Sequence, residues 1–114
     1  MSVLHLTLKK KRFDMIASGE KKEEYREIKP YWEKRLASFH PDAAVGGDFY
    51  NKHHPGCYVF RRFDAIMFRN GYGKNSPTML VECKGITYGT AYPEWSDNWK
   101  GNVFIIKLGK ILQP

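Results

Sequence analysis

Four residues in the segment 19–26, which reads G-E-K-K-E-E-Y-R, have types and a spacing that suit a polar site: Gly19, Lys21, Glu24 and Arg26. A lysine can contact phosphate or act as a base, and a glutamate can accept hydrogen bonds or transfer a proton. An arginine can bind phosphate or stack on a base. Core packing alone explains three such charges poorly. The segment therefore invites interpretation as a ligand or catalytic site.

Each of these residues also has a simpler structural interpretation. Gly19 can end a helix, and Lys21 can be a solvated lysine on a positive surface. In a strand, Glu24 and Arg26 point to the same face, so they can form an ion pair that braces the fold. Tyr25 points to the opposite face and is expected in the core. From the sequence, the structural and functional interpretations stay open.

The elements that position these residues follow from the apolar pattern. Residues 4–8 alternate between leucine and polar residues, which predicts a half-buried strand. Helical spacing of apolar residues over 10–18 predicts a short helix, and Gly19 suits the left-handed position after its end. A second strand is expected over 22–28. Pro30 is suited to open a second helix, predicted to run to about Phe39.

Further along the chain, Gly and Pro residues predict a long loop at about 40–60. Alternating patterns then predict strands over 64–69 and 78–87, joined by a turn over 70–77. The segment 103–108 is apolar on both faces apart from Lys107, which predicts a strand buried on both sides.

This order of elements predicts a mainly β fold with two helices (α+β). A small, mostly antiparallel barrel or curled sheet with the helices packed on it would bury the apolar faces. The chain has 114 residues, 42% of them hydrophobic, which suits one domain over 1–114 with a loop insertion at about 40–60.

The formal charge of +7 favours an anionic partner such as nucleic acid, although many basic domains bind none. No apolar run is long enough for a membrane span, and the first residues do not resemble a secretory signal. We therefore expect no membrane association. Two isolated cysteines predict a reduced, cytoplasmic setting. The oligomeric state is open.

Other candidate ligand contacts are Arg69, Tyr72 and Lys84. The segment 70–74 could present backbone donors, an aromatic ring and a cation to a ligand, although a plain hairpin turn is the favoured interpretation. Glu82 and Lys84 could line the same cavity, but an ordinary surface ion pair is the simpler interpretation. We expect no cofactor and no metal, because the spacing of the candidate ligands does not match that of zinc sites. Those candidates are His40, His53, His54 and Cys57.

The motif resembles the G-x-K-x-x-E-x-R pattern of the ASCH domain family, part of the PUA-like superfamily, and the chain matches all four fixed positions. The runs F-D-A-I-M-F-R-N-G-Y-G and V-E-C-K-G-I-T-Y-G are similar to the central strands of its small bacterial and phage-type members. The resemblance covers most of the chain outside residues 40–60.

The resemblance implies a PUA-like β-barrel with a cleft near the motif that binds RNA or a nucleotide through Lys21, Glu24 and Arg26. Some relatives are hydrolases of acetylated cytidine or are linked to RNA cleavage, so Lys21 and Glu24 are the catalytic candidates if the chain is an enzyme. The amidohydrolase branch carries Thr at the position of Glu24, which weakens the transfer of its chemistry. A third alternative is a protein-interaction accessory domain.

Overall fold

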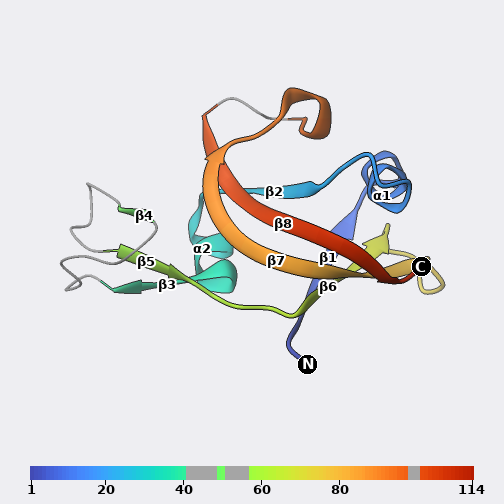
Figure 1. The fold of residues 1–114 in the computed structure, drawn as a ribbon, viewed down its shortest axis with the longest axis horizontal. Helices are drawn as coiled ribbons and strands as arrows, with labels where there is room; N and C mark the ends of the chain where they lie inside the picture. Colours follow the sequence, from blue (N-terminus) through green and yellow to red (C-terminus); the bar gives the residue numbers. More distant parts are fainter. Residues whose placement is uncertain (41–48, 51–56, 98–100) are drawn as a thin grey trace. The chain divides into compact units, whose positions relative to one another are not determined.

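The computed structural model of the chain describes the backbone of residues 1–40, 49–50, 57–97 and 101–114. It describes the side chains of residues 1–37, 59–97 and 101–114. These residues form an α+β fold with two α-helices and a five-stranded, mixed but mostly antiparallel sheet that curls into a half-barrel (Figure 1). The strand order in this sheet is β1-β6-β7-β8-β2, and a second sheet has the order β3-β5-β4. The predicted fold class is confirmed.

The described elements are, in chain order, β1 (Val3–Leu8), α1 (Lys10–Ala17), β2 (Glu23–Glu27), α2 (Pro30–Leu36), β3 (Ala37–His40), β4 (Phe49–Tyr50), β5 (Cys57–Phe60), β6 (Ala65–Asn70), β7 (Thr78–Thr90), the short 3-10 helix η1 (Pro93–Trp95) and β8 (Asn102–Gln113). Among the described residues, no helix has the length and apolar character that crossing a membrane requires.

The chain divides into two compact units, each assembled from separate stretches of sequence. Unit 1 comprises Met1–Glu24, Phe63–Gly85 and Ile106–Pro114, and unit 2 comprises Tyr25–Arg62 and Ile86–Ile105. The boundary falls inside the motif, so Lys21 and Glu24 belong to unit 1 and Arg26 to unit 2. The assignment of residues 1–114 to one domain stays a prediction.

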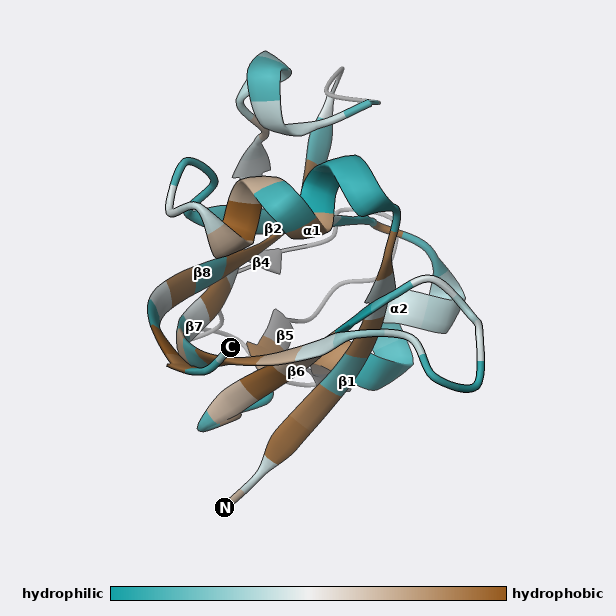
Figure 2. Ribbon diagram, turned by 90° about the vertical axis from the view of Figure 1, so that its right-hand side faces the viewer, coloured by the Kyte–Doolittle hydropathy of each residue, from teal (hydrophilic) through white to brown (hydrophobic). Residues whose placement is uncertain are grey.

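Unit 1 is built around β1 and β6, which run parallel with Val3 opposite Ala65. β6 and β7 form an antiparallel hairpin with Ala65 opposite Glu82. Alternating leucines of β1 are buried, as are Ala65, Ile66 and Phe68 of β6, and Figure 2 shows β1 as a largely hydrophobic strand. The predicted period-two pattern in β1 is confirmed.

Helix α1 follows β1 and ends where the sequence predicts. Phe13 and Ile16 are buried, as their helical spacing predicts. Gly19 has φ of +85°, and its N–H donates to the carbonyl oxygen of Ile16 at 3.0 Å. A side chain would be strained in this left-handed conformation. Lys21 N–H then donates to the carbonyl oxygen of Met15 at 3.0 Å, which fixes the bend leading into β2.

In unit 2, helix α2 begins at Pro30 as predicted but ends at Leu36. The prediction that it continues to Phe39 is wrong, because Ala37–His40 is extended and pairs antiparallel with Cys57–Phe60. Phe39 lies three residues after Leu36, a spacing that also fits a helix, so local pattern could not separate the two states. The predicted loop at about 40–60 contains β4 and β5, and its segments 41–48 and 51–56 lie outside the described residues.

The core of unit 2 contains Tyr25, Ala91, Val103 and Ile105, with Trp95 packed against them. The hydroxyl oxygen of Tyr25 accepts a hydrogen bond from the Tyr92 amide at 3.2 Å. The prediction that Tyr25 is a core residue is confirmed. The packing of Trp95 attaches its loop to this core.

The last strand, β8, has buried residues on both faces over Val103–Ile106 and again at Leu108, while Lys107 is exposed. This confirms a strand buried on both sides. The predicted end at Leu108 is wrong, because β8 continues to Gln113. The continuation passes through Gly109, a residue that weakens strand patterns in sequence.

Candidate functional site

The Lys21 and Glu24 side chains form a buried ion pair in unit 1. They are 1% and 5% exposed, and Lys21 Nζ donates to Glu24 Oε1. The turn at Gly19 and the hydrogen bond from the Lys21 amide to Met15 fix the backbone from which the Lys21 side chain enters the unit. Lys21 is therefore not a solvated surface lysine. A buried charge is tolerated when an opposite charge and further hydrogen bonds compensate it, and Glu24 supplies the opposite charge.

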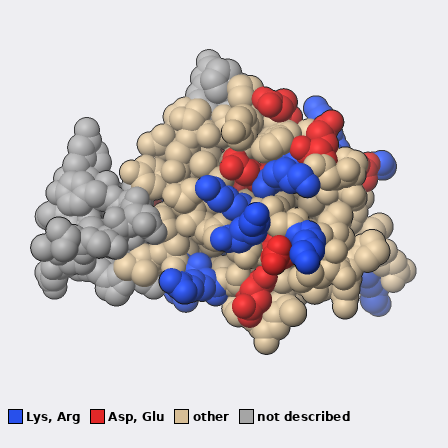
Figure 3. All heavy atoms as spheres, viewed as in Figure 1, with Lys and Arg blue, Asp and Glu red and all other residues tan. Residues whose placement is uncertain are grey.

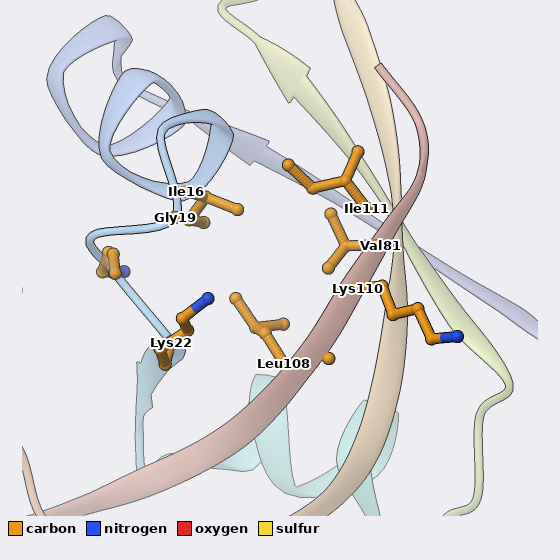
Figure 4. Close-up of a pocket in the computed structure, with 9 residues that line it drawn as sticks. Ile16, Gly19, Lys22, Val81, Leu108, Lys110 and Ile111 are labelled. Carbon is orange, nitrogen blue, oxygen red and sulfur yellow. The ribbon is translucent and has the colours of Figure 1, made fainter.

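A hollow of about 170 Å³ lies beside this pair (Figure 4). Its apolar walls come from the end of α1 and from the two long strands of the unit, β7 and β8. It is lined by Ile16, Gly19, Lys21, Lys22, Val81, Leu108, Gly109, Lys110 and Ile111. Figure 4 shows the Ile16, Val81 and Leu108 side chains directed toward the same space.

The Lys22 ammonium is the cation directed into this space, whereas the Lys110 amine points away from it (Figure 4). A Cβ atom placed on Gly19 would lie 3.7 Å from Lys22 Nζ, so the ammonium sits beside the C-terminal end of α1. The negative end of a helix dipole favours a cation at this place. The site therefore combines apolar walls with a positioned positive charge.

The volume limits what the hollow can hold. An apolar cavity of about 150 Å³ accommodates a benzene molecule, whereas drug-sized ligands occupy about 300–1,000 Å³. One six-membered ring with an attached anionic group would therefore suit a hollow of about 170 Å³. A larger ligand would place only part of itself inside.

Glu82 does not line the hollow, and its carboxylate lies against the backbone of β8. The Lys110 amide donates to Glu82 Oε1 at 3.3 Å. A Cβ atom on Gly109 would lie 3.1 Å from the Glu82 Cβ and 2.8 Å from its Cδ, and closer still to Oε1. Glycine at position 109 thus makes room for the carboxylate. The described hydrogen bond of Glu82 goes to this backbone, and Lys84 is exposed.

Arg26 belongs to unit 2, and its described contacts lie there. Its Nη1 donates to the carbonyl oxygen of Tyr25 at 2.8 Å, and its Cζ lies 5.0 Å from the centroid of the Trp32 ring. The structure thus brings Lys21 and Glu24 together. The convergence of all three charged residues of the motif in one cleft stays a prediction.

The other predicted contacts are distributed differently. The nine residues that line the hollow do not include Arg69, Tyr72 or Lys84. Arg69 Nη2 donates to the carbonyl oxygens of Gly73 at 2.7 Å and Lys74 at 3.2 Å, so it braces the turn between β6 and β7. The segment therefore forms a hairpin turn, and a ligand contact at Arg69 or Tyr72 stays a prediction. Tyr72, at the tip, is 91% exposed.

Cys83 has the properties of a structural thiol. Partial burial raises its pKa and outweighs the lowering by the backbone hydrogen bond with Gly85, and the charge of Asp64 adds a smaller upward contribution. A raised pKa reduces the thiolate fraction near neutral pH, so Cys83 is a poor nucleophile. Within the described part of the chain, no cluster of three metal-ligating side chains occurs. His53 and His54 lie outside it, as do the side chains of His40 and Cys57.

Sequence reasoning missed most of the residues that line the hollow, including Lys22, Leu108, Lys110 and Ile111. Gly109 carried a usable signal, since an isolated glycine in an apolar strand pattern marks close approach of another group.

The described charges on one face of the molecule are mixed in sign. Figure 3 shows cationic and anionic side chains interspersed on the side that it presents. Compared with protein-family models, curated proteins and solved structures, the chain matches none of them. The ASCH resemblance therefore rests on the motif and on the order of elements around it.

Proposed function

We propose that this chain is an ASCH-type domain that binds a nucleotide, free or as part of an RNA strand, in the hollow beside Lys21. The observation that carries the proposal is an apolar hollow of about 170 Å³ into which the Lys22 ammonium points. Apolar walls can bury one flat ring, and an ammonium matches the phosphate attached to it. The motif and the net charge of +7 support the same ligand class.

In this proposal Lys21, which lines the hollow and pairs with the buried Glu24, adds a polar group to its wall. The ion pair and burial fix the position of this donor, and fixed polar groups give a small site its specificity. A pyrimidine edge presents acceptors for such a donor. We place this function in the cytoplasm, without metal or cofactor.

The proposal is tested by titrating the protein with cytidine monophosphate, with cytidine and with inorganic phosphate, using calorimetry. We expect the nucleotide to bind more tightly than either part alone. Lys22→Gln should weaken nucleotide binding about tenfold, since a hydrogen bond to a charged group contributes about 1.5–3 kcal/mol. Lys107→Gln is the matched control, because Lys107 is an exposed lysine of β8 that does not line the hollow.

Two results would contradict the proposal. One is the absence of nucleotide binding by the unmodified protein at low salt. The other is an equal, small loss of nucleotide affinity in Lys22→Gln and Lys107→Gln, which would show that net charge alone attracts the nucleotide. Because Lys22 and Lys107 are both exposed, neither substitution is expected to unfold the protein.

A second candidate function is hydrolysis of an acylated nucleoside, favoured by the placement of the Lys21–Glu24 pair at the border of the hollow. The two residues could exchange a proton with a bound amide and water. Incubation with acetylated cytidine should then release cytidine and acetate, detected by chromatography, and Lys21→Ala should abolish release at a temperature where circular dichroism shows it folded. Nucleotide binding without release of product would support the binding function and contradict hydrolysis.

A further inference from the structure

Four side chains of unit 2 contact one another in a continuous series that we call the aromatic ladder: Arg26, Trp32, Tyr31 and Arg35. The Arg26 Cζ lies 5.0 Å from the centroid of the Trp32 ring. The Trp32 and Tyr31 centroids are 4.8 Å apart with their planes at 87°. The Arg35 Cζ lies 4.8 Å from the Tyr31 centroid. Two aromatic rings therefore stand between two guanidinium groups.

The local sequence explains this arrangement. Pro30 starts α2, so Tyr31 and Arg35 are four residues apart on one helix and share a face. Trp32 follows Tyr31 directly and meets Arg26 of β2. The hydrogen bond from Arg26 Nη1 to the Tyr25 carbonyl, at 2.8 Å, fixes the guanidinium of Arg26. Short, rigid connections thus hold the ladder in place.

The ladder lies at the surface. Tyr31 is 53% exposed although Arg35 covers part of its ring, and Arg35 is exposed as well. Trp32 and Arg26 are half-buried, whereas Leu36 of the same helix is fully buried. The helix therefore packs through Leu36, and core packing does not account for Tyr31.

The charge around the ladder selects the kind of partner. The segment 26–35 contains four cations and two anions, and the last turn of α2 carries Lys34 and Arg35. A polyanion with accessible aromatic faces complements both features. Unpaired nucleotides have this chemistry, because their bases stack on aromatic rings and guanidinium planes while their phosphates accept hydrogen bonds from arginine. Paired duplex bases do not present their faces.

We propose that the aromatic ladder is a docking surface for single-stranded nucleic acid, with a base on Tyr31 and a phosphate at Arg35. The Arg35 guanidinium faces the Tyr31 ring, and a guanidinium in this position can direct its in-plane N–H groups to phosphate oxygens. All four side chains of the ladder belong to unit 2. Binding at the ladder therefore does not require the nucleotide hollow of unit 1. It adds a second contact for a strand rather than another site for a mononucleotide.

The experiment measures binding of fluorescein-labelled oligouridine by anisotropy at low salt, with Tyr31→Ala and Tyr31→Phe. Tyr31→Ala should weaken binding at least tenfold, which corresponds to about 1.4 kcal/mol, whereas Tyr31→Phe keeps the ring and should bind like the unmodified chain. Tyr92→Ala is the matched control. Tyr92 is a tyrosine of the same unit that is 52% exposed and packs against Trp95 at 4.9 Å.

A salt titration tests whether Arg35 contacts a phosphate. Arg35→Gln should reduce the slope of log K against log salt by about 0.7, the value for one phosphate contact on a single strand. Oligothymidine in place of oligouridine shows whether the strand must be RNA, and a duplex competitor should displace the probe poorly.

The proposal is overturned if Tyr31→Ala binds oligouridine like Tyr92→Ala, or if the unmodified chain does not bind it at low salt. Calorimetry with cytidine monophosphate keeps this outcome separate from the function proposed for unit 1. Tyr31→Ala should leave mononucleotide binding unchanged, and Lys22→Gln should weaken it.

Discussion

The two halves of one motif handle their charges in opposite ways. Lys21 and Glu24 in unit 1 form an ion pair that is almost completely buried. Arg26, two residues later and in unit 2, lies over the Trp32 ring at a half-exposed position. Removal of one buried charge leaves the other without compensation, whereas an exposed guanidinium is solvated with or without its ring. Stability should therefore depend strongly on the first group and weakly on the second.

The largest effect is expected from breaking the buried pair. Lys21→Met leaves Glu24 charged in an apolar environment and should lower the free energy of unfolding by about 3–5 kcal/mol. Urea denaturation followed by circular dichroism measures this change.

The double variant Lys21→Met/Glu24→Leu is the control for that experiment. Replacing both members of a buried pair by apolar residues is often neutral or stabilising, so it should recover most of the lost stability. If Lys21→Met alone lowers the free energy of unfolding by less than about 1 kcal/mol, the upper value for an exposed ion pair, the two halves of the motif do not differ in stability as described.

A half-buried carboxylate should give an intermediate effect. Gly109→Ala places a methyl group against the Glu82 carboxylate and should cost about 1–3 kcal/mol, the usual range for overpacking. Differential scanning calorimetry can measure it. In the Glu82→Ala background the same substitution should cost clearly less, because the oxygen and Cδ contacts are gone. Additive losses in this cycle would contradict the contact.

Arg26 should matter less for stability. Arg26→Gln removes the contact with the Trp32 ring and should lower the free energy of unfolding by about 0.5–1 kcal/mol, the range for cation–π contacts at exposed sites. Urea denaturation measures the loss, with Arg35→Gln as the matched variant at the other end of the ladder. A loss as large as that of Lys21→Met would show that the two halves of the motif do not differ as described.

The smallest effect is expected from the exposed pair Lys10–Asp14 on α1, whose Nζ and Oδ2 atoms are 2.6 Å apart. Its side chains are 80% and 52% exposed. Lys10→Gln should change the free energy of unfolding by about 0.3–0.5 kcal/mol, as for other i,i+4 pairs, and less at high salt. Thermal denaturation at two salt concentrations provides the measurement.

The parts of the fold that local physics determines could be predicted from the sequence. The leucine alternation of β1, the helical stripe of α1 and the left-handed glycine at position 19 depend on neighbours within a few residues. Each of them is found as expected. The end of α2 was wrong because Phe39 fits a helical spacing, and only the pairing of β3 with β5 makes that segment a strand.

The site was predictable in part for the same reason. Strand alternation placed Glu24 opposite to Tyr25 and suggested Arg26 as its partner. The described partner of Glu24 is Lys21, which reaches it from the bend where strand alternation does not apply. The hollow was not predictable, because it forms where the end of α1 meets β7 and the last residues of β8. Such meetings depend on tertiary packing rather than on local pattern.

The parallel pairing of β1 with β6 has a consequence for how the chain reaches its structure. Ser2 N–H donates to Asp64 Oδ2 across 62 residues of sequence, and the β1–β6 register begins next to this contact. A parallel pair cannot form through a tight turn, so a long stretch of chain must close before any of its hydrogen bonds are made. The β6–β7 hairpin has no such requirement. We therefore expect β1 to join after the rate-limiting step of folding, so that Leu6→Ala speeds unfolding more than it slows refolding in stopped-flow experiments. The first strand in the sequence would then be among the last to pair with the sheet.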